Sequence, residues 1–205
     1  MVYQYPNACL IVFCKAPVPG QVKTRLSPEL SSEQAAVAHR KLTQRLLDWL
    51  LQAALCPIQL WCSPNTEHAF FQQCVEDYGV TLYQQCDGDL GVKMDHALQS
   101  SLKHFDRALL IGCDCPSLSE ADIQQALADL KHYDVVLSPA EDGGYVMIGC
   151  DYPQPMLFND ITWGSNQVLS ATLDRVETLD LRYKLTELQW DVDTFSDWQR
   201  FCQMK

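Results

Sequence analysis

Two features of the sequence predict an α/β fold with a mostly parallel central sheet. Segments with strand character alternate with segments of helical character almost from end to end. Several strand-like segments are continuous apolar runs, the strongest of which is 107–112 (RALLIG), and such runs are typical of strands covered by helices on both faces. No repeat, low-complexity tract or linker interrupts the alternation. We therefore expect residues 1–205 to form a single domain with right-handed crossovers.

The elements of the first half follow from apolar runs and from helix-end residues. A continuous apolar run predicts the first strand at 9–13, and three prolines and a glycine between Lys15 and Pro28 predict a loop after it. The capping-box pattern Ser31-Ser-Glu-Gln34 predicts a long helix that continues to about Leu55. The next elements predicted are a strand at 58–62, a helix at 66–78 closed by Gly79, a strand at 80–83 and a helix at 91–105.

The second half continues the same alternation. After the strand at 107–112, Ser119 and Asp122 form an N-cap pattern for a helix that extends to Lys131, and the chain returns as a strand at 134–138. The remaining elements predicted are a strand at 144–149, a helix at 166–175, a short strand at 176–179 and a final helix at 195–202.

Composition and charge exclude several classes of protein. Hydrophobic residues make up 47% of the chain, which excludes a disordered protein. The net charge is −11, which argues against a nucleic-acid or anionic-membrane surface. The ten cysteines form no C-x-x-C pair, so we expect reduced thiols and a cytoplasmic protein. The early apolar run stops at Lys15, so we expect no membrane span. The histidines show no metal-ligand spacing, and we expect His39, His68 and His104 on helix surfaces.

A cationic cluster follows the first predicted strand, at the edge where parallel sheets bind ligands. Lys15, Lys23 and Arg25 lie on one loop together with Thr24 and Gly20. Arginine binds phosphate through two N–H groups, lysine adds a mobile charge, and glycine lets backbone N–H groups approach an anion. We predict that this loop binds a diphosphate or triphosphate; a solvated basic loop is the alternative.

Acidic side chains supply a candidate metal site. Asp114 follows the buried strand 107–112, and Asp191 and Asp193 flank Val192 just before the last predicted helix. Carboxylates bind hard divalent cations, which in turn bridge phosphate oxygens. We predict Asp114 as one metal ligand, with a turn or helix-cap aspartate as the alternative. Asp191 and Asp193 together are a candidate second anchor for the metal, with capping of the last helix by Asp193 as the alternative.

The loop after the strand at 134–138 is the candidate acceptor side. Glu141 or Asp142 can orient or deprotonate an acceptor hydroxyl. Gly143 and Gly144 let this loop approach an acceptor closely, with Tyr145 beside them. The alternative is a hairpin turn, because Asp-Gly is a common turn dipeptide.

Two further segments are weaker candidates. Asp89 and Gly91 open a predicted helix and can bind a base or ribose through backbone groups, with a plain N-cap as the alternative for Asp89. Trp163, in the segment TWGS, is predicted as part of an acceptor-side lid, with a place in the core as the alternative.

Taken in order, six sequence blocks resemble the DUF2064 family of small bacterial glycosyltransferase-like proteins. They are LIVFCKAPVPGQVKTRL, GDLGVKM, LLIGCDCPSL, SPAEDGGYVMIG, TWGS and DVDT. The family belongs to the nucleotide-diphospho-sugar transferase superfamily, which has the GT-A fold, and the resemblance spans about residues 8–198. It implies a Rossmann-like sandwich with a mostly parallel central sheet, a nucleotide-diphosphate ligand and a divalent metal, Mg²⁺ or Mn²⁺.

The same resemblance implies roles for individual residues. It supports Lys15, Lys23 and Arg25 as ligands of the phosphates and Asp114 as a metal ligand. Asp193 matches the Asp-Thr segment of sugar-nucleotide cytidylyltransferases, in which this aspartate helps to hold the metal.

The function that these observations imply is a metal-dependent transferase with a nucleotide-activated donor. The first form of this hypothesis is a glycosyltransferase that acts on a nucleoside-diphosphate sugar and a small-molecule acceptor. The alternative is a nucleotidylyltransferase that joins a nucleoside triphosphate to a phosphorylated small molecule and releases pyrophosphate. The Lys23-Thr-Arg25-Leu loop also resembles the guanylyltransferases of phospholactate metabolism, and this resemblance supports the nucleotidylyltransferase alternative. A third hypothesis is a nucleotide-binding module without turnover.

Overall fold

Seven strands form one central sheet in the order β3-β2-β1-β4-β6-β5-β7, in a computed structural model that describes residues 2–204. The strands are β1 (Ala8–Lys15), β2 (Ile58–Ser63), β3 (Thr81–Gln84), β4 (Arg107–Gly112), β5 (Val135–Pro139), β6 (Tyr145–Cys150) and β7 (Tyr183–Leu185). Only β6 runs antiparallel to its neighbours, β4 and β5. The prediction of an α/β fold with a mostly parallel sheet is confirmed.

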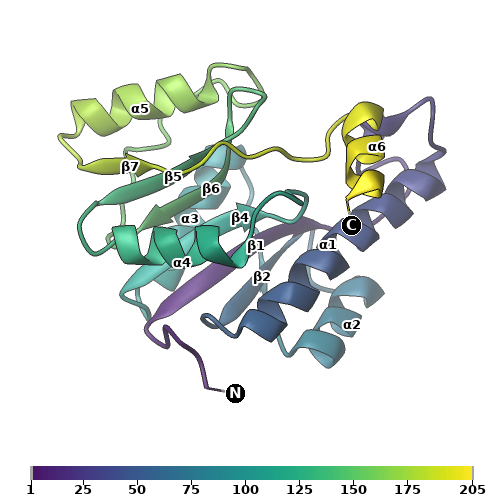
Figure 1. The fold of residues 1–205 in the computed structure, drawn as a ribbon, viewed down its shortest axis with the longest axis horizontal. Helices are drawn as coiled ribbons and strands as arrows, with labels where there is room; N and C mark the ends of the chain where they lie inside the picture. The colour runs from purple at the N-terminus through teal and green to yellow at the C-terminus, as the bar shows by residue number, and fades with distance from the viewer. Residues whose placement is uncertain (1, 205) are drawn as a thin grey trace.

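Helices cover both faces of this sheet (Figure 1). They are the 3₁₀ helix η1 (Thr24–Leu26), α1 (Ser32–Ala53), α2 (Ala69–Tyr78), α3 (Leu90–Ser101), α4 (Glu120–Asp129), α5 (Val168–Thr178) and α6 (Phe195–Gln203). One core lies between the sheet and α1, α2 and α4, and includes Leu47, Phe71 and Leu127. A second core lies between the opposite face and α3 and α5, and includes Leu98 and Val176. This two-sided burial explains why β1 and β4 are continuous apolar runs.

The predicted elements differ from the structure most clearly near residue 176. The strand predicted at 176–179 is wrong, because α5 continues to Thr178 and the next strand, β7, begins at Tyr183. The buried residues of α5 are Val168, Thr172 and Val176, whose spacing of four places them on one helical face. Val176 therefore anchors a helix, and β7 pairs in parallel with β5.

The site is positioned by strand ends and by the final segment of the chain. The strands β1, β4 and β5 present their carboxyl ends at one edge of the sheet. From β7 the chain crosses that edge, pairs at Gln189 with Ala140, and enters α6 (Figure 1). Trp190, Val192 and Phe201 then pack against Leu26 and Leu42 in a third core. This packing fixes the acidic segment 191–193 beside the loop that follows β1.

All ten cysteines are free thiols. Within residues 2–204, no helix combines the length and the apolar character that crossing a bilayer requires.

Candidate functional site

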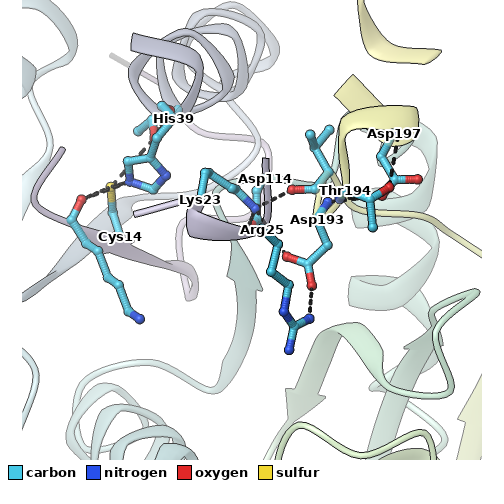
Figure 2. A network of polar contacts seen from close by, with 11 residues as sticks. Cys14, Lys23, Arg25, His39, Asp114, Asp193, Thr194 and Asp197 are labelled. Carbon is cyan, nitrogen blue, oxygen red and sulfur yellow. Dashed lines mark hydrogen bonds and ion pairs between the residues drawn. The ribbon is translucent and has the colours of Figure 1, made fainter. Parts of the chain in front are cut away.

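Lys23 lies at the centre of the site (Figure 2). Its Nζ donates a hydrogen bond to Oδ2 of Asp114 at 2.6 Å and another to the carbonyl oxygen of Val192, and it lies 3.6 Å from Oδ1 of Asp193. The Lys23 side chain is only 6% exposed. A cation from the loop after β1 thus meets the two carboxylates that the sequence analysis predicted as metal ligands.

The loop that carries Lys23 is fixed by core packing. Lys23 adopts a left-handed backbone conformation with φ of 49°, which turns the chain into η1. Leu26 at the end of η1 is fully buried in the same core as Ala38 and Leu42 of α1. The loop therefore presents its cations from a rigid base.

The ion pair shifts both titrating groups toward their charged forms. Burial alone would lower the pKa of Lys23, but the negative charges of Asp114 and Asp193 raise it above the ordinary value. Burial alone would likewise raise the pKa of Asp114, but the charge and hydrogen bond of Lys23 lower it. The pair is therefore ionised at neutral pH.

Asp191 is a carboxylate whose charge is poorly compensated. Burial, together with the negative charges of Asp114 and Asp193, raises the pKa of Asp191 to about 7, and the positive charge of Lys23 offsets only part of this rise. Asp193, in contrast, is paired with Lys23 and also accepts a hydrogen bond from Nη1 of Arg25 at 2.7 Å. The sequence analysis placed both residues on one segment, and the family resemblance implied only Asp193 as a ligand.

A cavity of about 520 Å³ adjoins the Lys23 network on the side of β1 and α3. Its lining includes Lys15, Lys23, Thr24 and Arg25, which are four of the predicted phosphate ligands. Lys93 of α3 also lines it. Lys93 was not predicted as a phosphate ligand, although its place in the first turn of the helix after Asp89 puts it near the same sheet edge. We call this space the donor cavity.

The other residues predicted to bind the nucleotide have structural roles in this fold. Gly20 adopts φ of 78° in the exposed turn before Lys23. Asp89 is the N-cap of α3, because its Oδ1 accepts a hydrogen bond from the backbone N–H of Val92 at 2.9 Å. Gly91 lies under the indole of Trp163, where an added Cβ would be 2.8 Å from Cζ2. Contact of these residues with a nucleotide stays a prediction.

A second cavity of about 240 Å³ lies beside the first and shares Asp114 with it. Asp142, Tyr145, Trp163 and Asp191 line it, with Gly144 also at its wall. The indole Nε1 of Trp163 is buried and has no hydrogen-bond partner within residues 2–204. A ligand in this cavity therefore meets three carboxylates and aromatic walls. We call it the acceptor cavity.

The structure separates the two acidic residues of the acceptor loop. Glu141 forms an ion pair with Arg200 of α6 at 2.9 Å, and Arg200 lies 4.0 Å above the ring of Trp190. Asp142 lines the acceptor cavity, and its Oδ1 accepts a hydrogen bond from the N–H of Gly144 at 2.9 Å. Of the two candidates, Asp142 lines this cavity and Glu141 does not.

Gly143 is required by the tight turn between these residues. Its φ is 89°, and an added Cβ would lie 2.2 Å from the carbonyl oxygen of Asn166. The acceptor loop is thus held against the segment before α5, and Leu169 donates its N–H to the Gly143 carbonyl.

The expectation that His39 lies on a helix surface is wrong. The residue is 4% exposed, and its Nε2 lies 2.9 Å from the carbonyl oxygen of Lys15 and 3.7 Å from Sγ of Cys14. It projects from α1 under the loop that follows β1 (Figure 2). Its place on α1 explains this burial, because His39 lies four residues after the buried Ala35 and four before the buried Thr43 and so shares their helical face.

Comparisons with known proteins bear out the family and the fold. Residues 46–165 match the model of the DUF2064 family, which is described as uncharacterised protein conserved in bacteria. A crystal structure from Desulfovibrio desulfuricans G20, provisionally described as a nucleotide-diphospho-sugar transferase, aligns with a TM-score of 0.83 and 31% identity, over 92% of this chain and 83% of that one.

A second relative is the 2-phospho-L-lactate guanylyltransferase of Methanothermobacter thermautotrophicus. It is 26% identical over 130 residues, which make up 60% of this chain and 53% of the relative, so the match spans about half of that protein. The 4-diphosphocytidyl-2C-methyl-D-erythritol synthase of Anaerococcus prevotii shares the fold, with a TM-score of 0.63 and 8% identity over 97% of this chain and 99% of that one. The fold is therefore of the GT-A type, and these relatives place the chain among the transferases.

Proposed function

Since this chain belongs to the DUF2064 family, we propose that it transfers a glycosyl group from a nucleoside-diphosphate sugar to a small-molecule acceptor. The observation that carries the proposal is the contact of Lys23 with Asp114 and Asp193 beside two adjoining cavities. Such a site holds a charged leaving group in one cavity and the attacking group in the other. Placing both reactants at fixed positions is itself a large part of catalysis.

The donor diphosphate would bind in the donor cavity. Lys15, Arg25 and Lys93 line this space and would face the phosphate oxygens. Positive charge fixed in advance stabilises the negative charge that develops on a departing diphosphate. Arg25, which is 69% exposed, can leave Asp193 and bind phosphate at little cost, since surface ion pairs contribute about 1 kcal/mol or less.

Asp114 and Asp191 both line the acceptor cavity, and they would hold a divalent cation there. Carboxylate oxygens are the ligands that Mg²⁺ and Mn²⁺ prefer. The raised pKa of Asp191 indicates a negative charge that the surrounding protein does not balance, as expected of a cation ligand. When bound, the ion would add positive charge next to the leaving diphosphate. Asp193 would then keep its role as partner of Lys23 and Arg25.

Asp142 would hold the acceptor. Its carboxylate lines the acceptor cavity and can take a proton from an acceptor hydroxyl as that oxygen attacks. Trp163 forms an aromatic wall of the same cavity, against which the acceptor would pack. The acceptor would therefore carry hydroxyl or other oxygen groups.

A second candidate function is nucleotidylyl transfer. The guanylyltransferase relative supports it, whereas the structure from Desulfovibrio desulfuricans, which covers more of the chain, supports glycosyl transfer. In both reactions a diphosphate group leaves, but glycosyl transfer releases a nucleoside diphosphate and nucleotidylyl transfer releases pyrophosphate.

The product that leaves decides between them. The purified chain would be incubated with Mg²⁺ and either nucleoside-diphosphate sugars or nucleoside triphosphates, with an arm that contains GTP and 2-phospho-L-lactate. We expect release of nucleoside diphosphate from a sugar nucleotide. Pyrophosphate release would instead establish the second candidate. If no nucleotide raises the melting temperature with or without metal, both candidates are wrong.

Substitution of Asp142 and Glu141 tests the acceptor side as a matched pair. We expect Asp142→Asn to lower kcat by about 10²-fold or more, the usual loss for a general base. Glu141→Gln should change kcat by no more than about threefold, because Glu141 is 50% exposed and its pairing with Arg200 lies outside the cavity. Equal losses in the two variants would contradict the assignment of Asp142.

Asp191→Asn should stabilise the protein in neutral and alkaline solution. The pKa of Asp191 is about 7 in the folded chain against an ordinary 3.8, so the folded state binds this proton more tightly than the unfolded state. The contribution of this group to stability therefore falls as the pH rises from 4 to 7, and asparagine removes that loss. Urea unfolding at pH 5 and pH 8 should show a gain for the variant that grows with pH, up to about 4 kcal/mol. Asp193→Asn, which breaks ion pairs, should show no gain.

A further inference from the structure

A second cluster of polar side chains lies beneath the loop that carries Lys23 and Arg25. It is separate from the carboxylates of the site described above. Cys14, His39 and Cys113 are all buried, and one ligand atom of each lies within 4.8 Å of the other two. The separation between Cys14 Sγ and His39 Nε2 is 3.7 Å (Figure 2). The transfer reaction proposed above uses none of these three side chains.

The fold itself brings the three residues together. β1 and β4 are parallel neighbours with Phe13 opposite Gly112, so Cys14 of β1 and Cys113, directly after β4, are the next residues along the two chains. Their side chains belong to the core on the α1 side of the sheet. His39 enters this core from α1.

We propose that Cys14, His39 and Cys113 bind a Zn²⁺ ion. Two thiolates and an imidazole form a donor set typical of zinc and unsuited to Mg²⁺. With Zn–S of about 2.3 Å and Zn–N of about 2.0–2.1 Å, a tetrahedral site separates sulfur from nitrogen by about 3.6 Å. The observed 3.7 Å between Cys14 Sγ and His39 Nε2 matches this sulfur–nitrogen separation.

Zinc would bind His39 through Nε2, the ring nitrogen that lies 3.7 Å from Cys14 Sγ and 2.9 Å from the carbonyl oxygen of Lys15. The metal would take the place of the contact with Lys15, because one ring nitrogen cannot hold both a proton and a metal ion. Three protein ligands leave one tetrahedral position open, and all three residues line the donor cavity, from which water can reach it.

Zinc at this position would hold together the edge of the sheet at which β1 and β4 end. Cys14 directly precedes Lys15, and Cys113 directly precedes Asp114. An ion held by both thiols and by α1 would fix the strand ends that present a phosphate-binding cation and a carboxylate. The site is independent of the proposed reaction, since it requires only the three side chains and their spacing.

Metal analysis of the purified protein tests the proposal. The chain would be expressed with zinc in the medium, purified without chelators or nickel resin, and its metal content measured by mass spectrometry. We expect one zinc per chain in the wild type and less than about a tenth of that in Cys14→Ser or Cys113→Ser. A matched control replaces Cys86 and Cys202, the two cysteines that are not buried, with serine and should keep its zinc.

A measurement on the wild type removes any dependence on the folding of the variants. Chelator-treated wild-type protein titrated with Co²⁺ should develop a thiolate-to-cobalt charge-transfer band that saturates at one equivalent. Absence of both zinc and this band overturns the proposal, as does full zinc content in the Cys14 or Cys113 variant. Isolation of a metal-free chain with a disulfide between Cys14 and Cys113 overturns it as well.

Discussion

Lys23→Met is expected to lower the free energy of unfolding by about 3–5 kcal/mol, the usual result of removing one partner from a buried ion pair. Methionine keeps most of the apolar stem but leaves Asp114 and the Val192 carbonyl without their donor. Because the pairing holds the pKa of Asp114 below its ordinary value, Asp114 contributes stability above about pH 4 and loses that contribution as the pH falls. The gap between wild type and variant should therefore narrow in acid, which urea unfolding at several pH values would measure.

Arg25→Met is the matched control for Lys23. Arg25 carries the same charge on the same loop and pairs with Asp193, but it is 69% exposed where Lys23 is 6% exposed. We expect its loss to cost about 1 kcal/mol or less. Both variants should bind nucleoside diphosphates more weakly than the wild type. Their affinity for a nucleoside without phosphates should fall less. A Lys23 variant as stable as the Arg25 variant would show that the ion pair with Asp114 does not support the fold.

Most of the fold was predictable because its determinants are local. The limits of β4 were predicted correctly, since an apolar run bounded by Arg107 and Gly112 leaves little choice. The starts of α1 and α4 were predicted because Ser31 and Ser119 form capping boxes that the structure contains. The strand predicted at 176–179 failed because a short apolar stretch has the same composition at a helix end and in a strand.

The candidate site was predictable only in part. Convergence of Lys23, Asp114 and Asp193 follows from parallel strands that end at one edge, and the structure brings these three residues together. The positions of the Lys23 and Arg25 side chains in space decide which of Asp191 and Asp193 is left without a cation. The spacing of residues in the sequence does not encode those positions. The cluster of Cys14, His39 and Cys113 was missed because its members lie on β1, on α1 and directly after β4, which are adjacent only after folding.

Asp114→Asn should lower turnover by about 10³-fold or more while the protein stays folded. The loss of a charged ligand removes several kcal/mol of electrostatic stabilisation from the transition state, and about 4 kcal/mol corresponds to 10³-fold. Asparagine has the same shape and keeps an oxygen that can accept the hydrogen bond from Lys23, so stability should fall less than in Lys23→Met. Steady-state kinetics and urea unfolding of the same preparations would measure the two effects separately.

The control for this variant is the removal of a charge at the opposite edge of the sheet. Asp180 is exposed and precedes β7, so it lies at the amino ends of the parallel strands, and its φ of 53° is one that asparagine tolerates. Asp180→Asn should keep wild-type turnover and the wild-type rise in melting temperature with nucleotide and Mg²⁺. Asp114→Asn should lose that metal-dependent rise, because Asp114 borders both cavities and is the carboxylate that the donor and acceptor sides share. If Asp114→Asn keeps both the rise and the turnover, the cation is held elsewhere and the proposed arrangement of the site is wrong.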